Sequence, residues 1–286
     1  MKLKLNPILT NESRLKMRNW RTFVLVAVYL TILGGLGIMF FATNYWSFQY
    51  GGVDLAQIGR NLFVFLSIIQ FLMIYFIVPG FTSNSITYER ERQTFDLLVC
   101  TQLTPMKIIS GKLLAALNNV VLLIFASLPI YGLVFLLGGV TLGELVKLVL
   151  IYLYTAFVYG GYYTFISSKF KKSQPAVIIS YVISLMFLGL TMIIASIIAV
   201  LFQARNLPLP FPYILLLNPG SMAEFLYPEV REFFNSISGG KYPFSGVFQG
   251  VKFWMLSGGI NIVLSGLCLY WASREVNPLR QSKRSG

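Results

Sequence analysis

The stretch "ITYERERQTFDLLVCTQLTPMKIISGK", residues 86–112, separates two long apolar parts of the sequence. It holds seven charged side chains, whereas the whole chain is 56% hydrophobic and only 12% charged. One charge at the centre of a membrane span costs about 2.5 to 3.5 kcal/mol, so seven would cost on the order of 20 kcal/mol in lipid. Residues 86–112 therefore lie in water or against a partner.

The apolar parts on both sides of this stretch are long enough to cross a membrane. The chain has 286 residues and a mean hydropathy of +0.70, which is too apolar for a soluble fold of this size. A helix of about 20 residues crosses the roughly 30 Å hydrocarbon core. We expect an all-α membrane protein whose six transmembrane helices form one domain over residues 22–272. The six apolar runs lie at 22–42, 60–81, 113–137, 144–168, 175–203 and 252–272.

Lys and Arg residues gather in alternate connecting segments. Six precede the first run, four lie in residues 82–112, three in 169–174 and four in the tail at 273–286. The segments on the other side hold six in all. Because cytoplasmic loops retain positive charge, this pattern predicts that both termini and the 82–112 loop are cytoplasmic. The excess of Lys and Arg in cytoplasmic segments beside the spans then accounts for the net charge of +13. The charge therefore does not indicate a nucleic-acid partner, and we expect no binding of nucleic acid.

The two ends of the chain are basic and polar. Residues 1–21 have two interpretations: a short helix on the inner membrane surface, with Asn6 as its N-cap and Pro7 in its first turn, or a basic tail that only sets the topology. Residues 273–286 are expected to be a disordered basic tail.

The segment 204–251 is the large outer connection between the fifth and sixth predicted spans. It is rich in Pro and aromatic residues. Asn218 and Pro219 follow the apolar "YILLL", which predicts backbone that dips into the outer leaflet and returns. Such backbone is tolerated at membrane depth only where protein or water surrounds it. The segment either gates an exit or forms a folded cap.

The sequence offers no residues grouped for catalysis or metal binding. His is absent, and Cys100 and Cys268 fall in a cytoplasmic loop and the last span, so no disulfide is predicted. No charge lies in the central part of a span, which argues against a proton- or ion-coupled carrier. The nearest approach to an ATP-binding loop, "SGKL" at 110–113, lacks an earlier glycine and a Ser or Thr after Lys. We expect no catalytic residue, no metal ligand and no cofactor in this chain.

The charged stretch itself has the pattern of a helix, a break and a second helix. Tyr88, Phe95 and Val99, with Leu98, recur at helical spacing. They lie beside polar Glu89, Gln93 and Asp96, which predicts an amphipathic helix. Thr104 and Pro105 then provide an N-cap and a first-turn residue for a helix that runs into the third span. The apolar stripe needs a covering surface, either the N-terminal helix of this chain or a partner. Ordinary solvation of a charged loop is a third interpretation.

This loop resembles the first cytoplasmic loop of type 2 ABC exporter permeases. The matching positions are Glu89, Glu91, Thr94, Leu97, Leu98, Thr104, Pro105, Gly111 and Lys112. The opening "NPILTNESRLKMR" is similar to the Asn-Pro-x-Leu start of many such subunits, and six spans with both ends inside also fit. The family usually has Gly just before the Thr, where this chain has Gln93, and that difference favours a continuous helix over a tight turn.

The resemblance implies that the loop contains the coupling helix, seated in a cleft of a separate ATP-binding subunit. The residues to which it assigns this role are Tyr88, Glu89, Arg90, Glu91, Arg92, Thr94, Phe95, Asp96, Leu97 and Leu98. The implied partners are ABC ATPase subunits that bind ATP and Mg, a second copy of the permease or a similar permease, and membrane lipid. The implied location is the plasma membrane of a bacterium.

Four polar residues within the predicted spans are candidates for a substrate path: Gln70, Ser180, Ser184 and Thr191. Ser and Thr also bond to carbonyls of their own helix, so local bonding is the simpler interpretation. The small-residue stretches "GGLG" (34–37), "YGGYY" (159–163) and "SGG" (257–259) allow close helix packing within the chain or between two copies.

The function we predict is that of a membrane subunit of an ATP-driven exporter for an amphipathic or hydrophobic substrate. Lipids, lipid-linked glycans, peptides and hydrophobic drugs all fit. A membrane scaffold or channel component that acts without ATP is the alternative, although it leaves the amphipathic hairpin unexplained. An intramembrane enzyme is disfavoured because no catalytic constellation is present.

Overall fold

The computed structural model describes residues 20–52, 54–94, 104–191, 193–194, 197, 201, 216–218 and 253–276. Every regular element within these residues is helical. The elements are α2 (Trp20–Gly51), α3 (Leu55–Thr82), α4 (Thr87–Glu91), α6 (Pro105–Leu136), α7 (Leu142–Lys169), α8 (Ser173–Leu185), the π-helix η1 (Met186–Leu190) and α12 (Phe253–Glu275). The predicted N-terminal interfacial helix, most of segment 204–251 and the tail beyond residue 276 lie outside the described residues.

Six helical stretches in the described part of the chain are long and apolar enough to cross a membrane, which confirms the predicted number of spans. The second begins at Leu55 instead of residue 60, because Asp54 takes the N-cap position and its carboxylate accepts a hydrogen bond from the Ala56 N–H (3.5 Å). The third begins at Pro105 directly after Thr104, as predicted.

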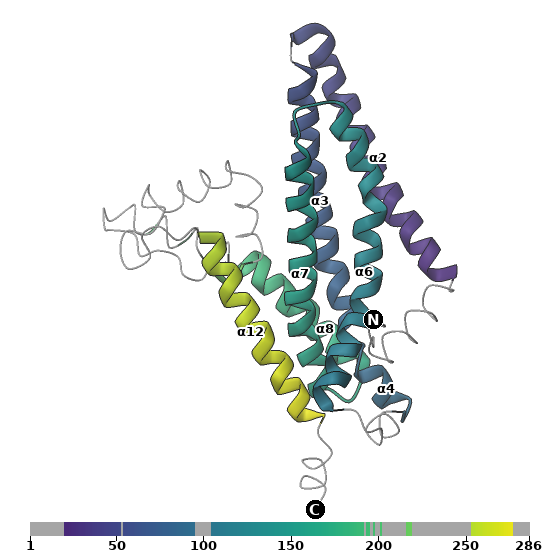
Figure 1. Cartoon of the computed structure of the whole chain (residues 1–286), viewed down its shortest axis with the longest axis vertical. Coiled ribbons are helices and arrows are strands. Elements are labelled where there is room, and N and C mark those ends of the chain that lie inside the picture. Colours follow the sequence, from purple (N-terminus) through teal and green to yellow (C-terminus); the bar gives the residue numbers. More distant parts are fainter. Residues whose placement is uncertain are drawn as a thin grey trace, which may run out of the picture.

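The long helices α3, α6 and α7 form the centre of the bundle. Figure 1 shows them side by side, with α2 along one side and α12 along the other. α8 packs on α3 and α7. The 28 residues of α3 extend about 42 Å. This length exceeds the roughly 30 Å hydrocarbon core, so α3 extends beyond the apolar layer.

Close packing between α7 and α12 depends on the small residues of "YGGYY". A Cβ placed on Gly161 would lie 2.1 Å from the Ser265 Oγ of α12, and one on Gly160 would lie 3.0 Å from the Leu113 Cδ1 of α6. A side chain at position 161 would require Ser265 to move, and one at position 160 would require Leu113 to shift. The predicted close helix packing is confirmed here as packing within one chain.

The fifth span changes helix type part-way along its length. α8 ends at Leu185 and continues as the π-helix η1, in which the backbone takes up one extra residue per turn. Two carbonyls in this region accept hydrogen bonds from side chains of other segments. The Ser184 carbonyl accepts from the Tyr75 hydroxyl (3.0 Å), and the Leu188 carbonyl accepts from Asn218 Nδ2 (3.2 Å).

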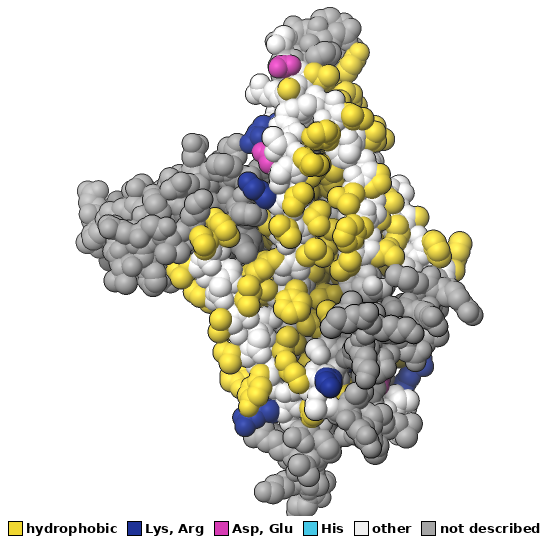
Figure 2. All heavy atoms as spheres, viewed as in Figure 1, with side chains coloured by type: hydrophobic (Ala, Val, Ile, Leu, Met, Phe, Trp, Pro, Cys, Tyr) yellow, Lys and Arg dark blue, Asp and Glu magenta, His cyan; other side chains and the backbone are white. Residues whose placement is uncertain are grey.

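Apolar side chains cover the outside of the bundle. Figure 2 shows hydrophobic side chains over the visible middle of the helices, with Lys and Arg near the lower end and a small group of charged side chains higher up. Phe23, Ile38, Leu136, Ile178 and Val263 are all more than half exposed on their helices. An apolar exterior of this extent suits contact with lipid chains.

Candidate functional site

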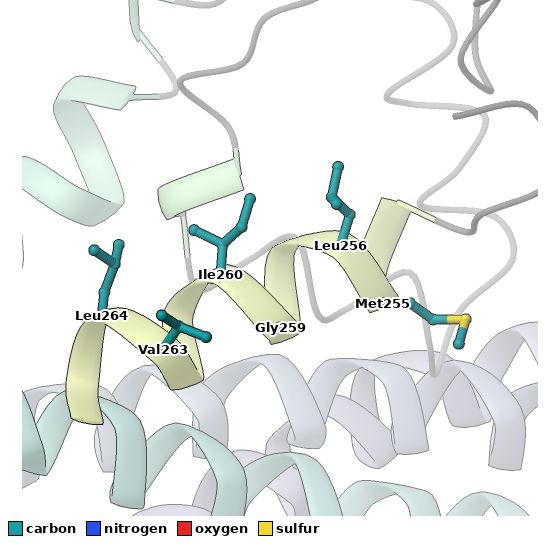
Figure 3. Close-up of a pocket in the computed structure, with 6 residues that line it drawn as sticks. All are labelled: Met255, Leu256, Gly259, Ile260, Val263 and Leu264. Carbon is teal, nitrogen blue, oxygen red and sulfur yellow. The ribbon is translucent and has the colours of Figure 1, made fainter. Parts of the chain in front are cut away.

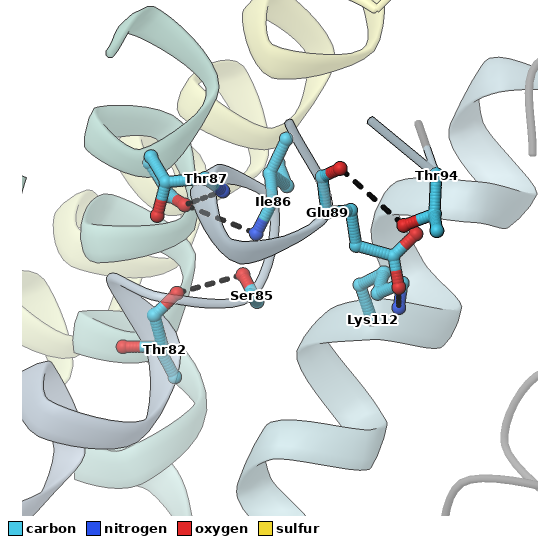
Figure 4. A network of polar contacts seen from close by, with 8 residues as sticks. Thr82, Ser85, Ile86, Thr87, Glu89, Thr94 and Lys112 are labelled. Atoms are coloured by element: carbon cyan, nitrogen blue, oxygen red, sulfur yellow. Dashed lines mark hydrogen bonds and ion pairs between the residues drawn. The ribbon is translucent and has the colours of Figure 1, made fainter. Parts of the chain in front are cut away.

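The turn between α3 and α4 is held by hydroxyl groups (Figure 4). The Ser85 Oγ donates to the Thr82 carbonyl (2.7 Å) in the turn that follows α3. Ser167 on α7 then accepts hydrogen bonds on its Oγ from the backbone N–H groups of Ile86 (3.1 Å) and Thr87 (3.2 Å). A side chain of α7 thus satisfies the first free N–H groups of α4.

Three consecutive charged residues of α4 reach three different helices. Successive residues of a helix project about 100° apart, so adjacent side chains fan outward. Glu89 forms an ion pair with Lys112 of α6, a lysine whose side chain is only 7% exposed. The Arg90 Nη1 donates to the carbonyl of Phe170, the residue that ends α7 (3.0 Å). The Glu91 carboxylate contacts the start of α8.

The contact between Glu91 and α8 uses both oxygens of the carboxylate. Oε1 accepts from the Ser173 backbone N–H (2.8 Å), and Oε2 accepts from the Ser173 hydroxyl (2.7 Å). The backbone hydrogen bond lowers the pKa of the Glu91 carboxyl, and the bond from the Ser173 hydroxyl lowers this pKa further. Glu91 therefore stays ionised at the end of a helix whose N–H groups favour negative charge.

α4 ends at Glu91, and a turn follows at Gln93, which corrects the expectation of a continuous helix through residue 93. Gln93 has φ +57°, in the left-handed region that glycine normally occupies. The Thr94 N–H donates to the Glu89 carbonyl (3.0 Å) and the Gln93 N–H to the Arg90 carbonyl (3.2 Å), which together form a Schellman motif. The tight turn forms without glycine, because the contacts of Glu89, Arg90 and Glu91 fix the helix that precedes it.

The surface of α4 that faces away from the bundle carries Tyr88 and Arg92. Tyr88 is 49% exposed, and the Arg92 guanidinium lies over its ring at 4.3 Å from the centroid. Thr94 is exposed too. Phe95, Asp96, Leu97 and Leu98 lie outside the described residues, as does the N-terminal segment that was one candidate to cover the stripe. The docking role of all ten loop residues stays a prediction.

The four predicted path residues all lie in the interior of the single chain. Gln70 is fully buried, and its Nε2 donates to the Ser127 Oγ of α6 (2.7 Å). The Ser180 hydroxyl donates to the Ala176 carbonyl one turn earlier (2.7 Å). Ser184 and Thr191 flank the π-helix and are buried as well. The last three lie along the fifth span, whereas Gln70 lies on α3 and bonds to α6, and the path role stays a prediction.

A cluster of aromatic rings fills the space between α3, α7 and η1. Tyr159 makes edge contacts with Tyr75 (5.2 Å between centroids), Tyr162 (5.5 Å) and Phe187 (6.2 Å). The sequence analysis did not single out this cluster. The available signal was the pair Tyr159 and Tyr162, which share a helix face three residues apart within "YGGYY".

Residues 216–218 are held by hydrogen bonds from α7 and α12, while the predicted dip into the outer leaflet stays a prediction. The Leu216 carbonyl accepts from Ser257 Oγ (2.7 Å) and Asn261 Nδ2 (2.8 Å) of α12. The Leu217 carbonyl accepts from the Tyr159 hydroxyl (3.1 Å). These backbone groups are therefore satisfied although they belong to no long helix.

The side chain of Asn218 fixes the same segment to the fifth span. Its Nδ2 donates to the Leu188 carbonyl of η1 (3.2 Å) and to the Thr191 Oγ1 (2.6 Å). Ser257 was predicted only as part of the small-residue stretch 257–259, and Asn261, the second anchor on α12, was not predicted. Their spacing of four residues on one face of the last predicted span was the available signal.

A family model described as "ABC-2 family transporter protein" matches residues 7–270. The chain belongs to the ABC-2 family of transporter proteins. This confirms the resemblance drawn from the 82–112 loop and the six-span layout. A comparison with curated proteins gave no match. As an ABC-2 family protein with six apolar helices among its described residues, the chain is a multi-pass membrane protein and a permease component of an ABC transporter.

An apolar hollow of about 450 Å³ runs along one stretch of α12 in this ABC-2 permease (Figure 3). The residues that line it are Met255, Leu256, Gly259, Ile260, Val263 and Leu264. None of them has a charged or hydrogen-bonding side chain, so these residues could hold an acyl chain and could not orient a polar ligand.

The described residues contain no group of three or more His, Cys, Asp or Glu side chains that could hold a metal ion. The acidic residues of the candidate site instead contact Lys112 and the N-terminus of α8. In this site of the ABC-2 permease, charged side chains connect the ends of neighbouring helices.

Proposed function

We propose that this chain is the membrane subunit of an ATP-driven exporter, and that α4 and the residues after it dock on a separate ATP-binding subunit. The observation that carries the proposal is the position of α4. It lies at one end of the bundle and bonds to α6, α7 and α8 through adjacent residues. A partner that moves α4 therefore pulls on several spans at once, which is what transmission by rigid elements requires.

The distribution of charge supports a cytoplasmic location for α4. Basic residues gather on α4 and at the ends of α6, α7, α8 and α12 that meet near it. They include Arg90, Arg92, Lys107, Lys112, Lys169, Lys171, Lys172 and Arg274. Arg60 and Lys147 lie toward the other end, where Arg60 pairs with Glu144 (3.3 Å). Because basic residues tend to be retained on the cytoplasmic side, this distribution supports a position of the α4 end inside the cell.

The apolar lining favours an amphipathic or hydrophobic substrate. The exterior is hydrophobic, and the hollow on α12 has only apolar lining among the described residues. In this proposal ATP and Mg are bound by the partner ATPase, which carries out hydrolysis. The permease pairs with a second copy or a similar chain in a bacterial plasma membrane.

Removal of the apolar stripe tests the proposal. The double variant Phe95→Asp with Leu98→Asp introduces two charges into the predicted docking surface. We expect an ATPase subunit that co-purifies with the wild-type chain to be lost, because burial of two unpaired carboxylates is strongly unfavourable. The measurement is the amount of ATPase recovered with the affinity-purified permease.

A matched control carries Thr101→Asp with Gln102→Asp, two carboxylates in the same loop outside the stripe, and should retain the ATPase. If the stripe variant still binds an ATPase whose hydrolysis remains coupled, the proposal is wrong. Loss of binding in both variants would contradict a specific role for the stripe.

A further inference from the structure

We propose that Glu91 is the positioning residue through which a displacement of α4 reaches the fifth span, because its carboxylate caps the N-terminus of α8. This inference rests on the proposed function, since it concerns how motion imposed on α4 travels. It also makes a claim about the isolated chain, namely that the start of α8 is held by a residue 82 positions earlier in the sequence.

The start of α8 lacks a cap from its own sequence. A helix leaves its first four N–H groups without partners, and the N-cap side chain usually accepts one of them. Here the N-cap position is Lys172, which has no side-chain hydrogen bond to the helix and carries only donors. Glu91 provides the missing acceptor through its two bonds to Ser173 (2.8 and 2.7 Å).

The bonds on either side of Glu91 make α4 stiff where it meets α8. Ser167 holds the first N–H groups of α4, and Arg90 holds the last carbonyl of α7. The Schellman motif at Gln93 closes the other end. α4 is thus a short rigid body, and Glu91 is its contact with the Ser173 N–H and hydroxyl.

The fifth span is also able to respond to such a displacement. Only 17% of its apolar stretch is buried inside the chain, the same share as for the first span and against 50% for the second, so few neighbours hold it in place. It contains the π-helix η1, an irregular turn where a helix can bend or shift register. Movement at Ser173 can therefore be absorbed at residues 186–190 and need not unfold the span.

The polar residues predicted to line a path lie on this same span. Ser180 and Ser184 are on α8, and Thr191 follows η1. The Ser184 carbonyl accepts from Tyr75 of α3, and the Thr191 Oγ1 accepts from Asn218. A shift of α8 would change the contact at Ser184, which lies before η1. Glu91 thus joins the docking loop to the helix that carries three of the four predicted path residues.

Hydrogen exchange on the purified chain tests the cap directly. In Glu91→Ala we expect the amides of Ser173, Gln174 and Ala176 to exchange about fivefold to tenfold faster, as for the loss of an N-cap. Glu91→Gln keeps an oxygen acceptor and should recover most of the protection. Ser173→Pro removes the N–H that donates to Glu91, at a first-turn position that tolerates proline. In this background, replacement of Glu91 should no longer change amide exchange in α8.

Gln174→Ala is the matched control on the same turn of α8, because Gln174 is exposed. It should leave exchange at Ser173 and Ala176 unchanged. If Glu91→Ala also leaves these amides at the wild-type rate, Glu91 does not cap α8 and the inference is overturned.

Exchange on the assembled complex, with and without ATP plus vanadate, tests transmission. In the wild type we expect nucleotide trapping to change exchange in both α4 and the first turn of α8. In Glu91→Ala the change in α4 should persist and the change in α8 should be lost. A response of α8 that persists in Glu91→Ala overturns the inference and leaves the proposed function standing. No ATPase bound, or no response in wild-type α4, overturns both.

Discussion

Gln93 shows how tertiary contacts decide a single backbone conformation. A left-handed conformation costs an ordinary residue roughly 1 to 2 kcal/mol, and Gln93 adopts it at φ +57°. The sequence rule that associates this turn with glycine predicts helix continuation here, and that prediction is wrong. The contacts that hold α4 come from Ser167, Lys112 and Ser173. These partners lie between 20 and 90 residues away in the sequence, so local sequence patterns could not reveal them.

Gln93→Gly should stabilise this turn. Glycine removes the steric cost of the left-handed conformation, although part of the gain is offset by the greater freedom of glycine in the unfolded chain. We expect the Thr94 amide, which donates to the Glu89 carbonyl (3.0 Å), to exchange severalfold more slowly in Gln93→Gly. Gln93→Val, whose β-branched side chain disfavours positive φ, should speed its exchange. Equal rates in both variants would show that the positive φ is not maintained in solution.

At the scale of elements, the sequence predicts those features of the helices that length and composition determine. The six spans and the start of α6 at Thr104 and Pro105 were predictable, because apolar runs must be helical in lipid and Pro suits a first helical turn. For residues 216–218, the sequence indicated only that their backbone needs protein or water around it. The partners of this backbone, Tyr159, Ser257 and Asn261, come from two other helices, and no local pattern pairs them with the segment.

Asn261 should be the main anchor of residues 216–218 on α12. Its Nδ2 donates to the Leu216 carbonyl (2.8 Å), while its Oδ1 accepts from the Tyr162 hydroxyl (3.1 Å). Asn261→Leu removes both bonds, each worth about 1 kcal/mol, and leaves the Leu216 carbonyl to the Ser257 hydroxyl. We expect the segment to detach from α12 more often.

Cysteine accessibility measures that detachment. With Cys100 and Cys268 replaced, Leu217→Cys should react severalfold faster with a water-soluble maleimide in the Asn261→Leu background. Val263→Leu changes an exposed residue of the same helix and provides the control. An unchanged rate in Asn261→Leu would mean that Ser257 and Tyr159 suffice to hold the segment.

At the scale of the whole molecule, the charged end of the bundle and the α4 network coincide, and both predict one orientation in the membrane. The pairs Glu89 with Lys112 and Lys169 with Glu275 lie at this end and join α4 to α6 and α7 to α12. Basic residues beside spans resist translocation, so the end that contains them should remain in the cytoplasm. An ATP-binding partner can reach α4 only on that side.

Labelling of intact cells with a membrane-impermeant maleimide tests the orientation, again in a chain without its native cysteines. Gln174→Cys lies at the exposed start of α8, and Leu142→Cys lies at the exposed start of α7, the opposite end of that helix from Lys169. We expect Leu142→Cys to react from outside, whereas Gln174→Cys should react only after the membrane is permeabilised. The reverse pattern would place α4 on the outer surface, beyond the reach of a cytoplasmic ATPase, and the proposed coupling could not operate.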